Sequence, residues 1–99
     1  MLSSKQRAIL RSEASKIEAI FQVGKGGVGN TIGAAVSDAL EARELIKLSV
    51  LDNSDGNVKD IAAQVAEKTG AEVVACIGKK IILYKESSKD EKKHYSRMI

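Results

Sequence analysis

The chain has 99 residues, enough for one domain, and its 43% apolar and 29% charged residues are typical of a globular protein. Sixteen Lys and Arg outweigh thirteen Asp and Glu, and the formal net charge of +3 permits a polyanionic partner without requiring one. The aromatic residues are two Tyr and one Phe, so the sequence does not favour a binding mode that stacks bases on a row of aromatic side chains.

Membrane and disulfide patterns narrow the class further. No apolar run approaches the roughly 20 residues of a membrane span, and Leu2 is followed at once by polar residues, unlike the start of a signal peptide. The single cysteine, Cys76, cannot form an internal disulfide. We therefore expect a cytoplasmic protein with no membrane partner.

The N-terminal part predicts a basic helix followed by a strand. Ser3 and Gln6 have the spacing of a capping box, which predicts a helix that starts at Ser3 or Ser4 and runs to about Lys16. The basic residues of this helix are Lys5, Arg7, Arg11 and Lys16. The apolar run from Ala19 to Val23 then predicts the first strand.

A second helix is predicted from Asn30, acting as its N-cap, to about Arg43. Apolar residues at helical spacing predict that one side of this helix faces a sheet. Its outward side is predicted to carry Ser37, Asp38, Glu41 and Glu44. The segment from Leu45 to Leu51 alternates apolar and polar residues, as a half-buried strand does.

The C-terminal half predicts one more helix and a hairpin. The predicted elements are a turn at 52–57, a helix at 58–69, and strands at 72–77 and 81–85. Gly70 is expected to end the helix in a left-handed conformation. We expect residues 1–86 to form the domain and residues 87–99 to form a polar, flexible tail.

These elements give the order α-β-α-β-α-β-β. Right-handed crossovers through the second and third helices would bring the first three strands into one sheet, and the last pair would add an antiparallel edge. The predicted fold is therefore a compact single α/β domain with a four-stranded mixed sheet packed with helices.

Glycines at positions 24, 26, 27 and 29 separate the first strand from the second helix. A strand, a glycine loop and a helix N-terminus in this order present backbone N–H groups and a positive dipole end to an anion, typically a phosphate. The phosphate can belong to a nucleotide triphosphate or to a nucleic-acid backbone.

Residues 24–31 approach the P-loop pattern G-x-x-x-x-G-K-[ST], and Lys25 stands where partition-type ATPases carry the extra lysine of their deviant Walker loop. However, the position of the final lysine is occupied by Asn30, whose uncharged amide cannot offset phosphate charge. A degenerate P-loop nucleotide-binding protein is therefore kept as an alternative.

The run Gly24-Lys25-Gly26-Gly27 matches G-x-x-G, the loop that clamps several nucleotides in KH domains. Glycine permits close approach because no Cβ stands between the backbone and a phosphate. Lys25 adds a positive charge at the tip of the loop. Together with the basic first helix, this pattern favours a nucleic-acid backbone as the ligand.

Six segments stand in unbroken order between about residues 2 and 86: Ser4-Lys5-Gln6-Arg7, Ile20-Phe21-Gln22-Val23-Gly24-Lys25-Gly26-Gly27, Val36-Ser37-Asp38-Ala39-Leu40, Arg43-Glu44-Leu45-Ile46-Lys47, Thr69-Gly70-Ala71-Glu72-Val73-Val74 and Ile77-Gly78-Lys79-Lys80-Ile81-Ile82-Leu83-Tyr84. Together they resemble the CRM (chloroplast RNA splicing and ribosome maturation) domain, and in particular the stand-alone bacterial YhbY family. The resemblance implies a fold similar to that of the C-terminal domain of translation initiation factor 3.

The resemblance also implies a function and a site. It implies a non-enzymatic RNA-binding protein whose partner is ribosomal RNA or its precursors, on the pre-50S particle, during large-subunit assembly. The implied RNA-binding residues are Gly24, Lys25, Gly26 and Gly27 of the loop and Lys5, Arg7, Arg11 and Lys47 of a basic surface. A protein-interaction module associated with the ribosome remains a second alternative.

The residue pattern contains no catalytic constellation. His94 lies in the predicted tail without a Cys or His partner, and Cys76 lies in a predicted strand. We therefore expect no catalytic residues, no metal, no cofactor and no small-molecule substrate.

Overall fold

The computed structural model describes residues 2–24, 29–52 and 57–99. The helices and strands are α1 (Ser4–Ala14), β1 (Ala19–Val23), α2 (Asn30–Arg43), β2 (Leu45–Val50), α3 (Val58–Thr69), β3 (Glu72–Ile77) and β4 (Lys80–Tyr84), followed by the short 3-10 turns η1 (Asp90–Lys92) and η2 (Tyr95–Arg97). This confirms the predicted α/β fold and element order, and no bound differs from the predicted one by more than two residues. Among the described residues, no helix combines the length and the apolar character needed to cross a membrane.

Helix ends follow from local sequence at three positions. Ser3 and Gln6 form the predicted capping box, and Asn57 caps α3 through a bond that its side chain accepts from the Asp60 N–H. Gly70 ends α3 with a left-handed φ of 75°, as predicted. The prediction for α2 was wrong, because Asn30 is the first helical residue and the N-cap is Gly29, which has no side chain to cap with.

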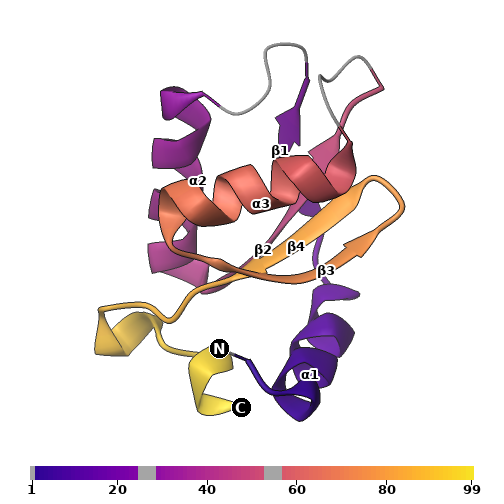
Figure 1. The fold of residues 1–99 in the computed structure, drawn as a ribbon. Helices are drawn as coiled ribbons and strands as arrows, with labels where there is room; N and C mark the ends of the chain where they lie inside the picture. The colour runs from indigo at the N-terminus through magenta and orange to yellow at the C-terminus, as the bar shows by residue number, and fades with distance from the viewer. Residues whose placement is uncertain (1, 25–28, 53–56) are drawn as a thin grey trace.

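The four strands form one mixed sheet in the order β1-β2-β4-β3. β1 and β2 are parallel, whereas β4 is antiparallel to both of its neighbours, β2 and β3. The predicted hairpin of β3 and β4 is thus present, and β4 is its inner strand. The strand order makes β1 and β3 the two edges of the sheet (Figure 1).

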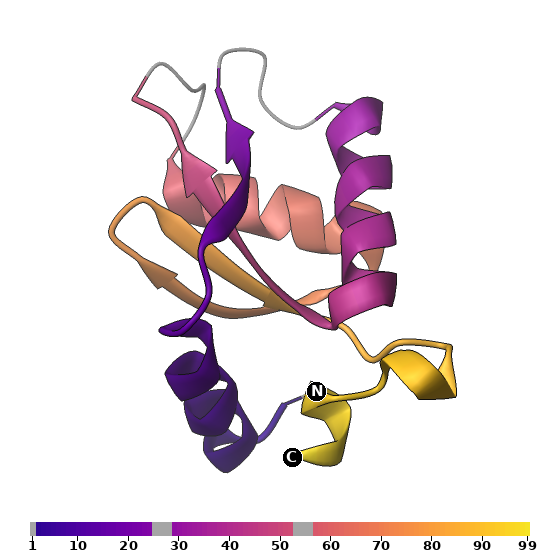
Figure 2. The ribbon, with the colours of Figure 1, turned by 180° about the vertical axis from the view of Figure 1, so that it is seen from behind.

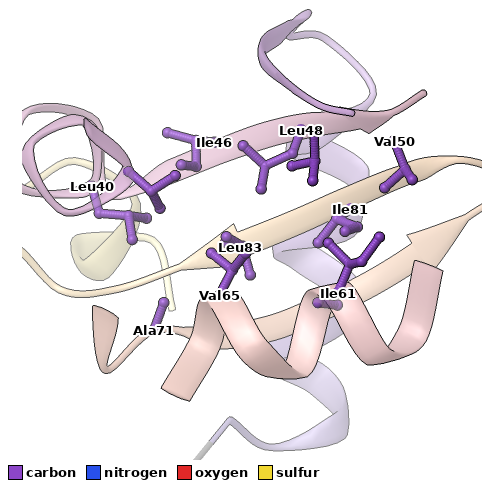
Figure 3. Packing of buried hydrophobic residues seen from close by; sticks show 12 residues of the cluster. Leu40, Ile46, Leu48, Val50, Ile61, Val65, Ala71, Ile81 and Leu83 are labelled. Carbon is purple, nitrogen blue, oxygen red and sulfur yellow. The ribbon is translucent and has the colours of Figure 1, made fainter. Parts of the chain in front are cut away.

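One face of the sheet is covered by α2 and α3 (Figure 1). Figure 3 shows how their apolar side chains meet those of the sheet, with Leu40 of α2 and Ile61 and Val65 of α3 directed at strand residues. The strand residues of this cluster include Ile46, Leu48, Val50, Ile81 and Leu83. Alternate residues of β2 supply this face, which is the period-two pattern that the sequence predicted for this strand.

The opposite face is covered only in part. Leu10 and Ala14 of α1 pack on Val74, Ile82 and other residues of a second, smaller apolar cluster. Tyr95 and Ile99 of the C-terminal segment pack against the same cluster. In Figure 2, α1 lies at the lower end of this face, and no helix of the described chain crosses in front of the upper ends of β1 and β2.

Glu44 departs from the sequence prediction most clearly. The helical pattern placed it on the outward side of α2, but its side chain is fully buried. Its carboxylate accepts hydrogen bonds from the N–H groups of Ser87, His94 and Ser96, at 2.8, 2.8 and 3.0 Å. The C-terminal segment therefore covers the end of α2 in the structure, while the flexibility expected of residues 87–99 stays a prediction.

The backbone of Glu44 is also unusual. It has a φ of 66°, in the range that favours glycine, and it is the only non-glycine residue with a positive φ among those the structure describes. Burial alone would raise the pKa of Glu44, but the three N–H donors overcome this effect and lower the pKa. A side chain with a structural task thus occupies a position where a glycine would fit the backbone better.

Candidate nucleic-acid interface

The glycine loop lies between the buried end of β1 and the start of α2. Val23 is fully buried, Gly24 follows it as a half-buried residue, and α2 begins after Gly29. Because the N-cap Gly29 has no side chain, it does not compete with a ligand for the first N–H groups of this helix. Of the predicted loop residues, Lys25, Gly26 and Gly27 lie outside the described residues.

The basic helix α1 carries three of the predicted RNA-binding residues. Lys5 and Arg11 are exposed, and within the described part of the chain neither forms a hydrogen bond or ion pair. Arg7 is half-buried, and its Nη1 donates to the carbonyl oxygens of Val73 and Val74, the latter at 3.1 Å. Arg7 therefore ties α1 to the edge strand β3, at the bulge between Val73 and Ala75.

A hollow of about 410 Å³ lies between α1 and β3. Its lining residues are Ser4, Arg7, Ala8, Arg11, Ser12 and Val74. Two guanidinium groups and two hydroxyls thus meet at one surface that no carboxylate lines. Guanidinium and hydroxyl donors of this kind suit the oxygens of a phosphate.

Lys47, the fourth predicted basic residue, also has a structural task. Its Nζ donates to the Ile17 carbonyl oxygen at 2.9 Å, and the side chain is half-buried. The bond ties β2 to the connection between α1 and β1. Lysine carries three donors, so Lys47 keeps two for other acceptors.

The predicted residues do not form one compact cluster. Val23, beside the loop, and Val73, beside Arg7, are separated by three strand spacings and four residues of register. At about 4.8 Å per spacing and about 3.3 Å per residue, they lie roughly 20 Å apart, at opposite corners of the sheet. The end of β1, which precedes the glycine loop in the sequence, and the basic hollow therefore lie at separate places on the sheet.

The hairpin between β3 and β4 adds lysines that sequence reasoning treated only as a turn. Lys79 forms an ion pair with Asp52, and its carbonyl oxygen accepts a hydrogen bond from Val50 N–H at 2.8 Å. Lys80 is exposed and donates to the hydroxyl of Ser49. Lys80 precedes Ile81, which belongs to the cluster under α2 and α3, so the Lys80 side chain points to the other side of the sheet.

Acidic and basic side chains meet on another part of the surface. Asp38, Glu41, Lys89 and Lys92 line a hollow of about 250 Å³ beside α2. The hydroxyl and N–H of Ser88, with the hydroxyl of Ser87, lower the pKa of Glu41 to about 2. This carboxylate therefore stays charged at neutral pH while it holds the C-terminal segment.

Metal-binding side chains do not cluster in the part of the chain that the structure describes. No group of three or more His, Cys, Asp or Glu side chains within them could hold a metal ion. Cys76 is half-buried, and burial raises the pKa of its thiol, so the reactive thiolate is disfavoured.

The fold and the surface together define a small mixed α/β domain in which two helices cover one face of the sheet and α1 covers part of the other. The chain belongs to the CRS1/YhbY (CRM) domain family, whose model matches residues 2–85. The family resemblance seen in the sequence is thereby confirmed.

Similar proteins agree with this assignment. The chain is 45% identical over 91 residues to the probable RNA-binding protein YqeI of Bacillus subtilis (strain 168), covering 92% of this chain and 95% of that protein. It is 29% identical over 86 residues to an RNA-binding protein of Haemophilus influenzae, covering 87% of each. The solution structure of a hypothetical Staphylococcus aureus protein, provisionally described as RNA-binding, matches with a TM-score of 0.78 and 41% identity, covering 95% of this chain and 98% of that one.

Proposed function

We propose that this protein is a non-enzymatic RNA-binding protein that holds an RNA backbone at two places, the glycine loop and the hollow between α1 and β3. The observation that carries the proposal is this hollow, where Arg7 and Arg11 meet two serine hydroxyls and no carboxylate. Two relatives that match most of the chain are named as RNA-binding proteins, which supports the same ligand.

The target that we propose is ribosomal RNA or its precursors, bound on the pre-50S particle during assembly of the large subunit. The basis is the family to which the chain belongs. The resemblance of the sequence to YhbY-like proteins is what implied this target. Phosphate contacts set affinity more than sequence preference, so binding should be salt-dependent and modestly selective.

The test combines two variants with one matched control. Arg11→Ala removes the exposed guanidinium of the hollow, and Gly26→Asp adds a carboxylate to the predicted loop. The control, Lys59→Ala, removes an exposed cation on α3, which covers the other face of the sheet. Fluorescence anisotropy with a labelled fragment of large-subunit ribosomal RNA measures affinity over a range of salt concentrations.

We expect Arg11→Ala to weaken binding by about threefold to tenfold and to lower the salt slope by about one. Gly26→Asp should weaken it more, because a negative charge would stand where a phosphate binds, whereas Lys59→Ala should bind like the wild type. Equal binding by all the folded proteins would contradict the proposal. Cosedimentation with the 50S particle that survives complete RNA digestion would instead favour the protein-interaction alternative.

A further inference from the structure

One row of side chains crosses the open half of the sheet, from edge to edge. Gln22 of β1 is opposite Ser49 of β2, Ser49 is opposite Lys80 of β4, and Lys80 is opposite Ile77 of β3. Residues paired across neighbouring strands point to the same side of a sheet. The four side chains therefore form a continuous row, here called the cross-strand row.

The cross-strand row lies on the side of α1 but beyond its cover. The next row toward α1 contains Lys47, Ile82 and Ala75, of which Ile82 is 1% exposed and belongs to the α1 cluster. By contrast, Gln22 and Lys80 are exposed, and Ile77 is 46% exposed. The part of the sheet that α1 covers thus ends between these two neighbouring rows.

The row also connects the two anchoring points of the proposed function. Gln22 stands two residues before Gly24, at the start of the glycine loop. Ile77 is on β3, the strand whose Val74 lines the Arg7 and Arg11 hollow. Three strand spacings make the row about 14 Å long, close to the span of four stacked nucleotides at about 3.4 Å each.

The chemistry of the row suits single-stranded RNA. The Lys80 ammonium donates one bond to Ser49 and keeps donors for a phosphate. The Gln22 amide and the Ser49 hydroxyl are neutral groups that can both donate and accept, as base edges and 2′-hydroxyls require. Ile77 offers an apolar contact at the far edge, and none of the four side chains is acidic.

We propose that the cross-strand row is a binding platform for a single-stranded RNA segment that passes from the glycine loop to the Arg7 and Arg11 hollow. This inference rests on the proposed function and adds the path and the kind of RNA. Lys80 contacts the backbone, and Gln22 with Ser49 contacts the Watson–Crick edges of bases. In a duplex these edges are already paired with the other strand, so the platform selects unpaired RNA.

The experiment uses two variants of the row, each with a chemically matched control on the other face of the sheet. Lys80→Ala is paired with Lys59→Ala, and Gln22→Ala is paired with Gln64→Ala, because Lys59 and Gln64 are both exposed on α3. The probes are a fluorescent oligoribonucleotide of 12 mixed bases, about the site size of a small single-strand-binding domain, and the same strand annealed to its complement. Thermal unfolding establishes that each variant is folded.

With the single strand, Lys80→Ala should lower affinity by about threefold to tenfold and reduce the salt slope by about 0.7. Gln22→Ala should lower affinity by about threefold without changing the slope, because a neutral contact releases no counterion. Both α3 controls should match the wild type, and with the duplex Gln22→Ala should change nothing.

Two outcomes would overturn the inference. In one, Lys80→Ala and Gln22→Ala bind the single strand like the wild type while Arg11→Ala is weakened, so that RNA binding stands but its path does not cross the row. In the other, Lys80→Ala and Lys59→Ala lose affinity equally, which would assign the effect to net charge. Failure of the wild type itself to bind any RNA would reject the proposed function and not the path alone.

Discussion

The two faces of the sheet use their side chains differently. On the α2 and α3 face, two helices cover a continuous apolar cluster, and residues such as Leu48 and Val65 are completely buried. On the other face, α1 covers one half, and the cross-strand row of Gln22, Ser49, Lys80 and Ile77 crosses the rest. A fold with three helices on a four-stranded sheet thus keeps part of one face available, and in this protein that part includes the exposed Lys80 and no acidic side chain in its cross-strand row.

The basic residues on the side of α1 fall into two groups, according to whether they lie where α1 meets the sheet. Arg7 and Lys47 lie where α1 meets the sheet, and both donate to backbone carbonyl oxygens. Lys5 and Arg11 lie outside this contact and are exposed. Charge at the edge of the covered region therefore stabilises the fold, whereas charge beyond it is available to a ligand.

The largest expected effect is on the covered face. Leu48→Ala removes a fully buried side chain that Figure 3 shows among its apolar neighbours, and we expect the free energy of unfolding to fall by about 3 kcal/mol. Urea denaturation measures it. Gln22→Ala, on the open face of the neighbouring strand, should change stability by less than about 0.5 kcal/mol. Similar losses for both variants would contradict the division between the faces.

The second effect concerns the segment that closes the end of α2. Glu44→Gln replaces an acceptor-only carboxylate with an amide whose NH₂ must face N–H donors of Ser87, His94 or Ser96. We expect a loss of about 2 kcal/mol in the free energy of unfolding at pH 7. Glu44→Gly is the companion variant, because it relaxes the positive φ but also removes the carboxylate.

The loss at Glu44 should depend on pH in a defined direction. The pKa of Glu44 is lowered in the folded state, so its contribution is fully present above the pKa of the unfolded chain and is lost as the pH falls through the folded value. The stability difference between wild type and Glu44→Gln should therefore narrow in acid. Unfolding measured from pH 7 to pH 3 tests this, and a constant difference would show that the carboxylate charge is not what holds the segment.

Local signals predicted most of the fold. The Ser3 and Gln6 capping box, the stop at Gly70 and the alternation in β2 each depend on residues close in the chain, and all are found in the structure. The position of Glu44 could not be predicted in this way. The helical pattern places its side chain on the outward side of α2. The segment that buries it and supplies its N–H donors lies more than 40 residues later in the chain.

The candidate site could be predicted only in its residue types. The sequence indicated basic residues on α1, but it could not tell that Arg7 reaches the carbonyl oxygens of β3 while Arg11 does not. It also could not place Lys80 beside Ser49, because that contact depends on the register of β4 against β2. Contacts between segments that are far apart in the sequence decide which basic side chains stabilise the fold and which remain exposed.

The smallest effect separates these two arginines, which are one helical turn apart on α1. Arg7→Ala leaves the Val73 and Val74 carbonyl oxygens without their guanidinium partner, and we expect a loss of about 1 kcal/mol in the free energy of unfolding. Arg11→Ala, with no such contact, should stay within about 0.5 kcal/mol of the wild type. Urea denaturation of both variants beside their RNA titrations would show stability and binding changing separately. If Arg11→Ala proved the more destabilising of the two, Arg11 would also stabilise the fold. The division between basic residues that stabilise the fold and basic residues that are available to a ligand would then not fall within α1.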